Sequence, residues 1–128
     1  MKTIRLRGVL AVLALLGVAT AAAAAEPDAG ARTEIAHLLK YLETYGCQFQ
    51  RNGSWYAPAR AASHLNQKYE YLLKKDMVTT AEQFIERAAT ESSASGKPYS
   101  VKCGDAEAVP SAEWLRAELQ RFRTKKEN

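Results

Sequence analysis

Apolar residues recur at helical spacing in four stretches of the chain, and this pattern predicts four amphipathic helices. The first helix is expected over residues 34–45, and the second from Pro58 to Lys75. The third follows Thr79, and the fourth begins at Ser111. The positions expected to face a common core are Ile35, Leu38, Leu39, Leu42, Ala61, Leu65, Tyr69, Leu72, Ala81, Phe84, Ile85, Ala88, Trp114, Leu115, Leu119 and Phe122.

Residues that suit helix capping stand at the predicted helix ends. We expect Thr33 to cap the start of the first helix, and Gly46 to end it in the left-handed conformation that glycine favours. Thr79 and Glu82 have the spacing of a capping box. Ser111 is the expected cap of the fourth helix.

The hydrophobic pattern changes between the first two helices. Asn52-Gly53, the preferred pair for a tight hairpin turn, separates residues 49–51 from residues 54–56. Residues 98–102 are expected to form a third short strand beside this hairpin. The chain is therefore expected to be mainly α, with about four helices and a small β-hairpin or three-stranded antiparallel sheet.

The first 25 residues have the organisation of a secretory signal peptide. Three basic residues come first, an apolar run follows over residues 9–19, and alanines occupy positions 21–25. We expect cleavage after Ala25 and export to the periplasm. The alternative is a membrane anchor, but the stretch from residue 9 to residue 25 is short for a membrane span and ends in alanines.

Cleavage would leave a flexible leader over residues 26–33, one compact helical domain over residues 34–123 and a charged tail over residues 124–128. The full chain has 18 basic and 14 acidic residues, and three of the basic ones lie in the signal peptide. A chain with 15 basic and 14 acidic residues has no general attraction for nucleic acid or anionic lipid. We therefore expect no nucleic-acid partner and no stable membrane anchor after cleavage.

Cys47 and Cys103 are the two cysteines, and an exported chain meets an oxidising compartment, so we expect them to form one disulfide. The alternatives are a reactive free thiol or metal ligands. The two histidines, His37 and His64, are far apart and show no metal-ligand spacing. We expect no metal site and no cofactor.

The second predicted helix carries a polar ridge beside its buried stripe. His64, Lys68, Tyr71 and Lys75 lie at i, i+4, i+7 and i+11, on one flank. Such a ridge could bind an anion or take part in proton transfer. It could equally consist of long side chains that cover the core and reach water. On the first helix, His37 is expected to face water.

A loop of small polar residues over 91–98 is a second candidate for a site. Ser92, Ser93, Ser95 and Lys97 could hold a polar ligand through hydroxyls and amides, or could simply form a turn. The loop lacks the first glycine and the final Ser or Thr of a phosphate-binding loop. The chain also lacks a Gly-x-Ser-x-Gly nucleophile elbow.

Aromatic residues are frequent in the predicted domain, where they can fill a small core or anchor a binding surface. Those expected in the core are Trp55, Tyr69 and Trp114. Those that are candidates for an exposed patch are Tyr56, Tyr71 and Tyr99. Glu82 and Glu86 share the wet face of the third helix, and we expect them to act as solubilising charges.

Three separated motifs are combined in the chain. They are Gly46-Cys47-x-Phe49-x-Arg51-Asn52-Gly53-x-Trp55-Tyr56, His64-Leu65-x-x-Lys68-Tyr69-x-Tyr71-Leu72 and Ser92-Ser93-x-Ser95-Gly96-Lys97-x-Tyr99-x-Val101-x-Cys103. Their combination, within residues 35–123, resembles the YfeK-like family of small exported proteobacterial proteins, a domain of unknown function. The resemblance implies a Gram-negative periplasmic protein with a disulfide and no assigned activity or cofactor.

The leading hypothesis is a non-enzymatic periplasmic binding or accessory module, whose partner is an unknown periplasmic protein or a cell-wall ligand. The residues expected to form its binding surface are Arg51, His64, Lys68, Tyr71, Ser92, Ser93, Ser95 and Lys97. One alternative is a small hydrolase or transferase with His64 as base and Ser93 or Ser95 as nucleophile. Another is a module that binds peptidoglycan through exposed aromatic residues.

Overall fold

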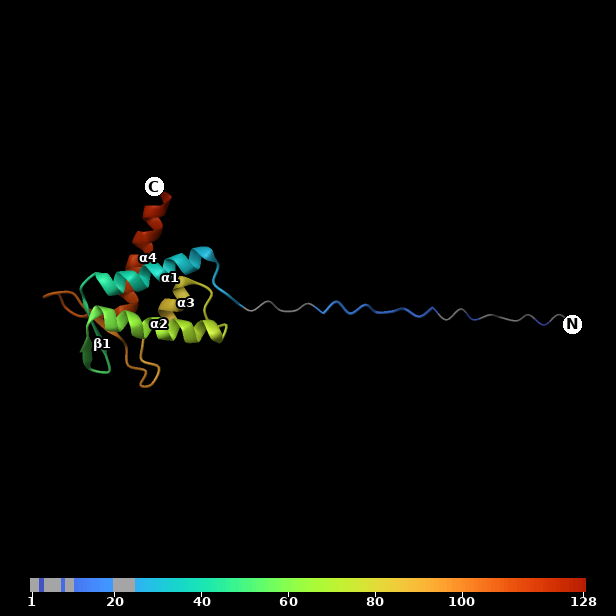
Figure 1. Cartoon of the computed structure of the whole chain (residues 1–128), viewed down its shortest axis with the longest axis horizontal. Coiled ribbons are helices and arrows are strands. Elements are labelled where there is room, and N and C mark those ends of the chain that lie inside the picture. Colours follow the sequence, from blue (N-terminus) through green and yellow to red (C-terminus); the bar gives the residue numbers. More distant parts are fainter. Residues whose placement is uncertain (1–2, 4–7, 9–10, 20–24) are drawn as a thin grey trace.

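The computed structural model describes residues 3, 8, 11–19 and 25–128, and its regular elements lie in the last of these ranges (Figure 1). This range contains four helices and one four-stranded antiparallel sheet, which confirms the expected fold class. The elements are α1 (Ala29–Thr44), β1 (Gln48–Arg51), β2 (Ser54–Tyr56), α2 (Pro58–Lys74), α3 (Ala81–Ala88), β3 (Ser100–Lys102), β4 (Val109–Pro110) and α4 (Ser111–Glu127).

The predicted signal peptide lies largely outside the described residues, since positions 1–2, 4–7, 9–10 and 20–24 are not among them. Residues 11–19 have no helix or strand, and their large apolar side chains are 84–94% exposed. This segment therefore contributes nothing to the core of the helical domain.

The core lies where α1 packs against the other three helices, and the sheet joins it through contacts of β1 with α2 and of β3 with α4. In Figure 1, α1 and α2 lie side by side, with the sheet near the end where α1 stops and α2 begins. The large buried residues include Ile35, Leu38, Leu42, Phe49, Leu65, Phe84, Ile85, Val101, Leu115 and Leu119. Most of the predicted apolar stripes are thus confirmed, and four of their members are only partly buried: Leu39, Tyr69, Trp114 and Phe122.

The sheet has the strand order β2-β1-β3-β4. The predicted hairpin joins β1 to β2, and both turn residues have positive φ angles, 50° at Asn52 and 80° at Gly53. The predicted third strand is confirmed as β3, whereas β4 is too short to show an alternating pattern in the sequence. The prediction that Trp55 lies in the core is wrong, because this residue is 39% exposed. Trp55 belongs to β2, an edge strand with a neighbouring strand on one side only.

The predicted disulfide between Cys47 and Cys103 is present. Gln48 of β1 is paired with Lys102 of β3, so the two cysteines occupy the next position of the same antiparallel register. Their Cα atoms are 4.3 Å apart, close to the spacing of directly opposed residues in such a pair of strands. The bridge thus ties the end of α1 to the segment that leads into α4.

The first helix begins earlier than predicted. Asp28 caps α1 by accepting a hydrogen bond from the Ala31 amide at 2.8 Å, and the helix includes residues 29–33, which we expected in a flexible leader. Thr33 is therefore inside the helix and not at its cap. Alanine favours helix without adding to the periodicity of large apolar residues on which the prediction depended. Gly46 follows the helix with a φ of 90°, as predicted.

The predicted caps of α3 and α4 are each one position away from the true ones. Thr80, not Thr79, caps α3 through the Gln83 amide, and the Gln83 side chain accepts from the Thr79 amide at 2.7 Å. Spacing alone does not distinguish two adjacent threonines. Ser111 is the first residue of α4 instead of its cap, and its buried hydroxyl has no hydrogen-bond partner in the described part of the chain.

The charged end of the chain is helical, since α4 continues through residues 124–127. Arg123 fixes this part of α4: it donates to Glu34 of α1 at 2.6 and 3.0 Å and also donates to Glu82 of α3. The hydrogen bond from Arg123 lowers the pKa of Glu82. Glu82 is therefore an ion-pair partner of Arg123. Its expected position on the solvent-exposed face of the helix did not indicate this role.

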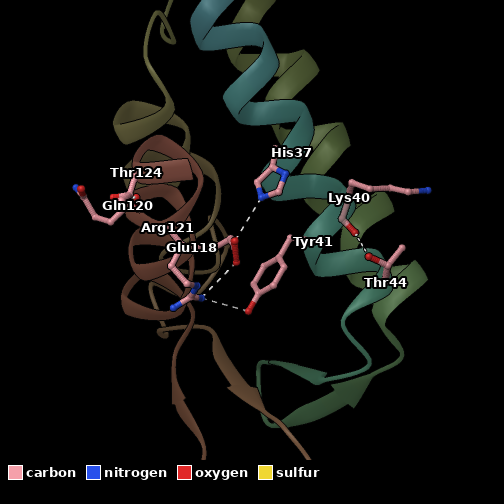
Figure 2. A network of polar contacts seen from close by, with 8 residues as sticks. All are labelled: His37, Lys40, Tyr41, Thr44, Glu118, Gln120, Arg121 and Thr124. Carbon is pink, nitrogen blue, oxygen red and sulfur yellow. Dashed lines mark hydrogen bonds and ion pairs between the residues drawn. The ribbon is translucent and has the colours of Figure 1, made fainter. Parts of the chain in front are cut away.

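A polar network joins α1 to α4 (Figure 2). His37 does not simply face water, as we expected, because its ring stacks on Phe122 with a centroid distance of 4.0 Å. Its Nε2 lies 3.4 Å from the carboxylate of Glu118, which is 7% exposed and also accepts from Arg121. These partners come from α4, so a helical wheel of α1 alone cannot reveal them.

Candidate functional site

Tyr99 is the centre of the main cluster of polar side chains. It immediately precedes β3 and is 1% exposed, and its ring packs against Phe49 with centroids 4.8 Å apart. The expectation that Tyr99 belongs to an exposed patch is wrong. The strand geometry explains this: side chains two positions apart share a face, so Tyr99 joins Val101 on the buried side of the sheet.

Two basic side chains reach the Tyr99 hydroxyl, and a third lies behind them. Lys68 donates to the hydroxyl from Nζ at 3.1 Å, and Nε2 of His64 lies 3.2 Å from it. Arg51, at the end of β1, places Nη1 3.1 Å from Nδ1 of His64. We call these four residues the Tyr99 cluster. The structure thus joins three of the residues that the sequence indicated and adds one that it placed elsewhere.

The surroundings of His64 favour its neutral form. Burial lowers the pKa of His64, and the positive charges of Arg51 and Lys68 lower it further. A neutral ring with its proton on Nε2 donates to Tyr99 and accepts from Arg51 at Nδ1, whereas a protonated ring has no acceptor for Arg51. Burial also lowers the pKa of Lys68 and raises the pKa of the Tyr99 hydroxyl.

We expect the domain to lose stability in mildly acidic solution because of His64. Its pKa in the folded protein lies below the ordinary value of 6.5, so the unfolded chain binds more protons, and the free energy of unfolding falls as the pH drops below 6.5. His64→Gln should remove this part of the pH dependence. Equilibrium unfolding of the wild type and of His64→Gln from about pH 8 to about pH 5 tests this expectation. The same dependence of the free energy of unfolding on pH in both proteins would contradict a neutral His64.

The serine loop supports the hairpin turn. Asn52 donates to the Ser92 hydroxyl at 3.3 Å and accepts from the hydroxyl of Ser95. Ser92 is 4% exposed, and its amide donates to the backbone carbonyl of Lys97. The hydrogen bonds of Ser92 and Ser95 thus hold two loops together, and no hydrogen bond between described residues joins a serine to His64.

An open pocket of about 860 Å³ lies between α2, α3 and the serine loop, and we call it the Tyr71 pocket. It brings together four of the residues expected in a site: His64, Lys68, Tyr71 and Ser93. Tyr71 is 59% exposed, as predicted, and Leu72 and Met77 line the pocket beside it. Lys97 is exposed and is not among the lining residues.

A smaller pocket of about 270 Å³ lies where the hairpin meets the start of α2, and we call it the Arg51 pocket. Tyr56 lies close to two arginines there, with its ring centroid 5.6 Å from the guanidinium carbon of Arg51 and 5.0 Å from that of Arg60. His64 lines both pockets. Arg60 has no signal in the sequence, because its position on the helix resembles that of any solubilising charge.

The described residues do not gather the ligands of a metal centre: no group of three or more His, Cys, Asp or Glu side chains among them is placed to hold an ion. In the same part of the chain, no helix is long and apolar enough to cross a membrane. The Tyr99 cluster and the two pockets offer basic groups, hydroxyls and aromatic rings.

Comparisons with known proteins give one match. No curated protein and no solved structure matches the chain significantly. A family model matches residues 29–123, which include every helix and strand of the domain except the last residues of α4. The match carries no link to the YfeK-like proteins, so that narrower resemblance stays a prediction. The chain belongs to the family of unknown function DUF5329.

Proposed function

We propose that this chain is a YfeK-like protein of a Gram-negative periplasm, exported with loss of residues 1–25, and that it works there as a binding or accessory module. The basic and apolar pattern of these residues supports export. The disulfide between Cys47 and Cys103 supports an oxidising compartment. The high exposure of the apolar side chains in residues 11–19 supports the removal of that segment.

The Tyr71 pocket is the surface that we assign to this function, because it collects four of the indicated residues around an exposed tyrosine. Tyrosine is a frequent anchor of protein interfaces, and Met77 extends its apolar surface with 44% exposure. Charges of both signs border the pocket: Lys68, Glu86, Arg87 and Glu91. An apolar centre with a rim of mixed charge suits a protein partner.

A hydrolase or transferase with His64 as base and Ser93 or Ser95 as nucleophile is the alternative. His64 is hydrogen-bonded to Arg51 and Tyr99, and Ser95 is bonded to the hairpin turn. The required contact between nucleophile and base is therefore not among the hydrogen bonds of the described residues. Labelling of Ser93 by a serine-reactive probe, with loss of labelling in His64→Ala, would support the enzyme instead.

A photo-crosslinking amino acid in place of Tyr71 should capture the partner in intact cells. Irradiation is expected to give a discrete adduct with one periplasmic protein, because the exposed side chain lies at the proposed contact. The matched control carries the same amino acid in place of Arg116, which is exposed on α4 and does not line the pocket. This control should give no such adduct.

Two outcomes would contradict the proposed interface. One is the absence of adducts from both Tyr71 and the neighbouring exposed position Lys97. The other is the same set of adducts from Tyr71 and Arg116. Co-sedimentation with purified sacculi, above the level of an unrelated protein, would in either case favour a cell-wall ligand.

A further inference from the structure

The guanidinium of Arg51 carries a charge that no carboxylate in the described part of the chain neutralises. Its hydrogen bonds run from Nη1 to the His64 ring, and its buried Nε has no partner among the described residues. Arg123 is the opposite case, since Glu34 and Glu82 both pair with its partly buried side chain. One partly buried arginine therefore has two counter-ions, and the other has none within the described domain.

The charge of Arg51 affects the ionisable groups around it. Burial is the largest influence on the pKa values of His64, Lys68 and Tyr99, and the charge of Arg51 acts to lower all three. Each of these effects favours the form with less positive charge. The region around Arg51 thus has a positive potential that an anion would relieve.

A second guanidinium lies at the same pocket. One aromatic ring, that of Tyr56, lies close to both Arg51 and Arg60. The described residues that line the Arg51 pocket include no Asp or Glu, whereas Ser63 and Gln67 add side chains that can donate hydrogen bonds. The first turn of α2 also has no acidic residue and no side-chain cap, so the positive end of its dipole adds to the same potential.

We propose that the Arg51 pocket binds a small oxyanion, a carboxylate or a phosphate group, between the guanidinium groups of Arg51 and Arg60. Arginine suits this role because its planar group offers several donors to two oxygen atoms at once. The volume of about 270 Å³ lies just below the range of roughly 300–1,000 Å³ for drug-sized ligands, so the anion carries few further atoms. The proposal is independent of the partner assigned to the Tyr71 pocket.

The test is a titration of the purified, disulfide-bonded protein with sodium phosphate and, separately, with sodium acetate. Sodium chloride keeps the ionic strength constant, and NMR follows the ring of His64. A bound anion should shift the ring signals in a saturable manner and raise the pKa of His64, because it introduces a negative charge beside the ring. Saturation by phosphate indicates that the pocket takes a phosphate group, and saturation by acetate indicates that it takes a carboxylate.

Arg60→Gln is the decisive variant, because Arg60 is exposed and makes no hydrogen bond to the Tyr99 cluster. Arg51→Lys is the second variant, and Arg116→Gln is the matched control on α4. We expect both pocket variants to bind at least about tenfold more weakly than the wild type, and the control to bind equally well. Thermal unfolding of each variant separates lost binding from lost folding.

The proposal is overturned if neither anion saturates the protein. It is also overturned if Arg60→Gln and Arg116→Gln bind the anion with equal affinity. Any weakening relative to the wild type would then come from the loss of one positive charge and not from the position of Arg60. If Arg51→Lys does not fold, Arg60→Gln alone decides the question.

Discussion

Replacement of both Cys47 and Cys103 by alanine should lower the free energy of unfolding by about 4 kcal/mol. The bridge joins residues that are 56 positions apart, and it limits the freedom of the unfolded chain more than that of the folded one. The loss is large against the roughly 5–15 kcal/mol that stabilises a typical domain. Urea unfolding of the wild type and the double variant measures it.

Reduction of the wild-type protein provides the matched control. A reductant should destabilise the wild type by a comparable amount and leave the double alanine variant unchanged, because that variant has no bridge to lose. Intact mass should rise by about 2 Da on reduction of the wild type. A double variant as stable as the wild type would contradict the role that we give to the bridge.

The features that the sequence predicts correctly depend on residues close together in the chain. The apolar stripes of α2 and α3 follow from helical spacing, and the hairpin follows from the backbone demands of Asn52-Gly53. The disulfide is an exception, because it joins distant residues. It was predictable because Cys47 has one possible partner and the leader indicates an oxidising compartment.

The features that the sequence does not predict depend on contacts between distant elements. Arg123 contacts Glu34, 89 positions away, and no local pattern marks either residue as a partner of the other. The same holds for His37 and Glu118, which are separated by 81 positions. Such pairs are set by the packing angles of α1 and α4, and residue spacing within one helix carries no information about those angles.

The candidate site also contains residues of both kinds: some are predicted by local spacing, and others depend on contacts between distant elements. His64 and Lys68 are one helical turn apart, so their common face could be predicted from spacing. The faces of Arg51 and Tyr99 depend on the register of short strands, where a shift by one residue would turn each side chain to the opposite side. The neighbouring strands and the core fix that register. The sequence around Tyr99 therefore does not show which face of the sheet its side chain takes.

Tyr99→Ala should lower the free energy of unfolding by about 3–5 kcal/mol, as expected for the loss of a buried aromatic side chain. Tyr99 is the largest of the fully buried residues, and it packs against Phe49 while it holds the polar groups of α2 in place. Removal would leave a cavity beneath the sheet and take the hydroxyl away from Lys68 and His64. Urea unfolding of the variant measures the combined loss.

Tyr99→Phe separates the hydroxyl from the ring. The phenylalanine keeps the packing but leaves the Lys68 ammonium with one acceptor, the Glu91 carbonyl, so we expect a smaller loss of about 1–3 kcal/mol. Tyr71→Phe is the matched control, because the hydroxyl of Tyr71 belongs to an exposed side chain. The free energy of unfolding of this control should equal that of the wild type. If Tyr99→Phe is as stable as this control, the hydroxyl does not organise the cluster. Lys68 and His64 would then owe their positions to α2 alone.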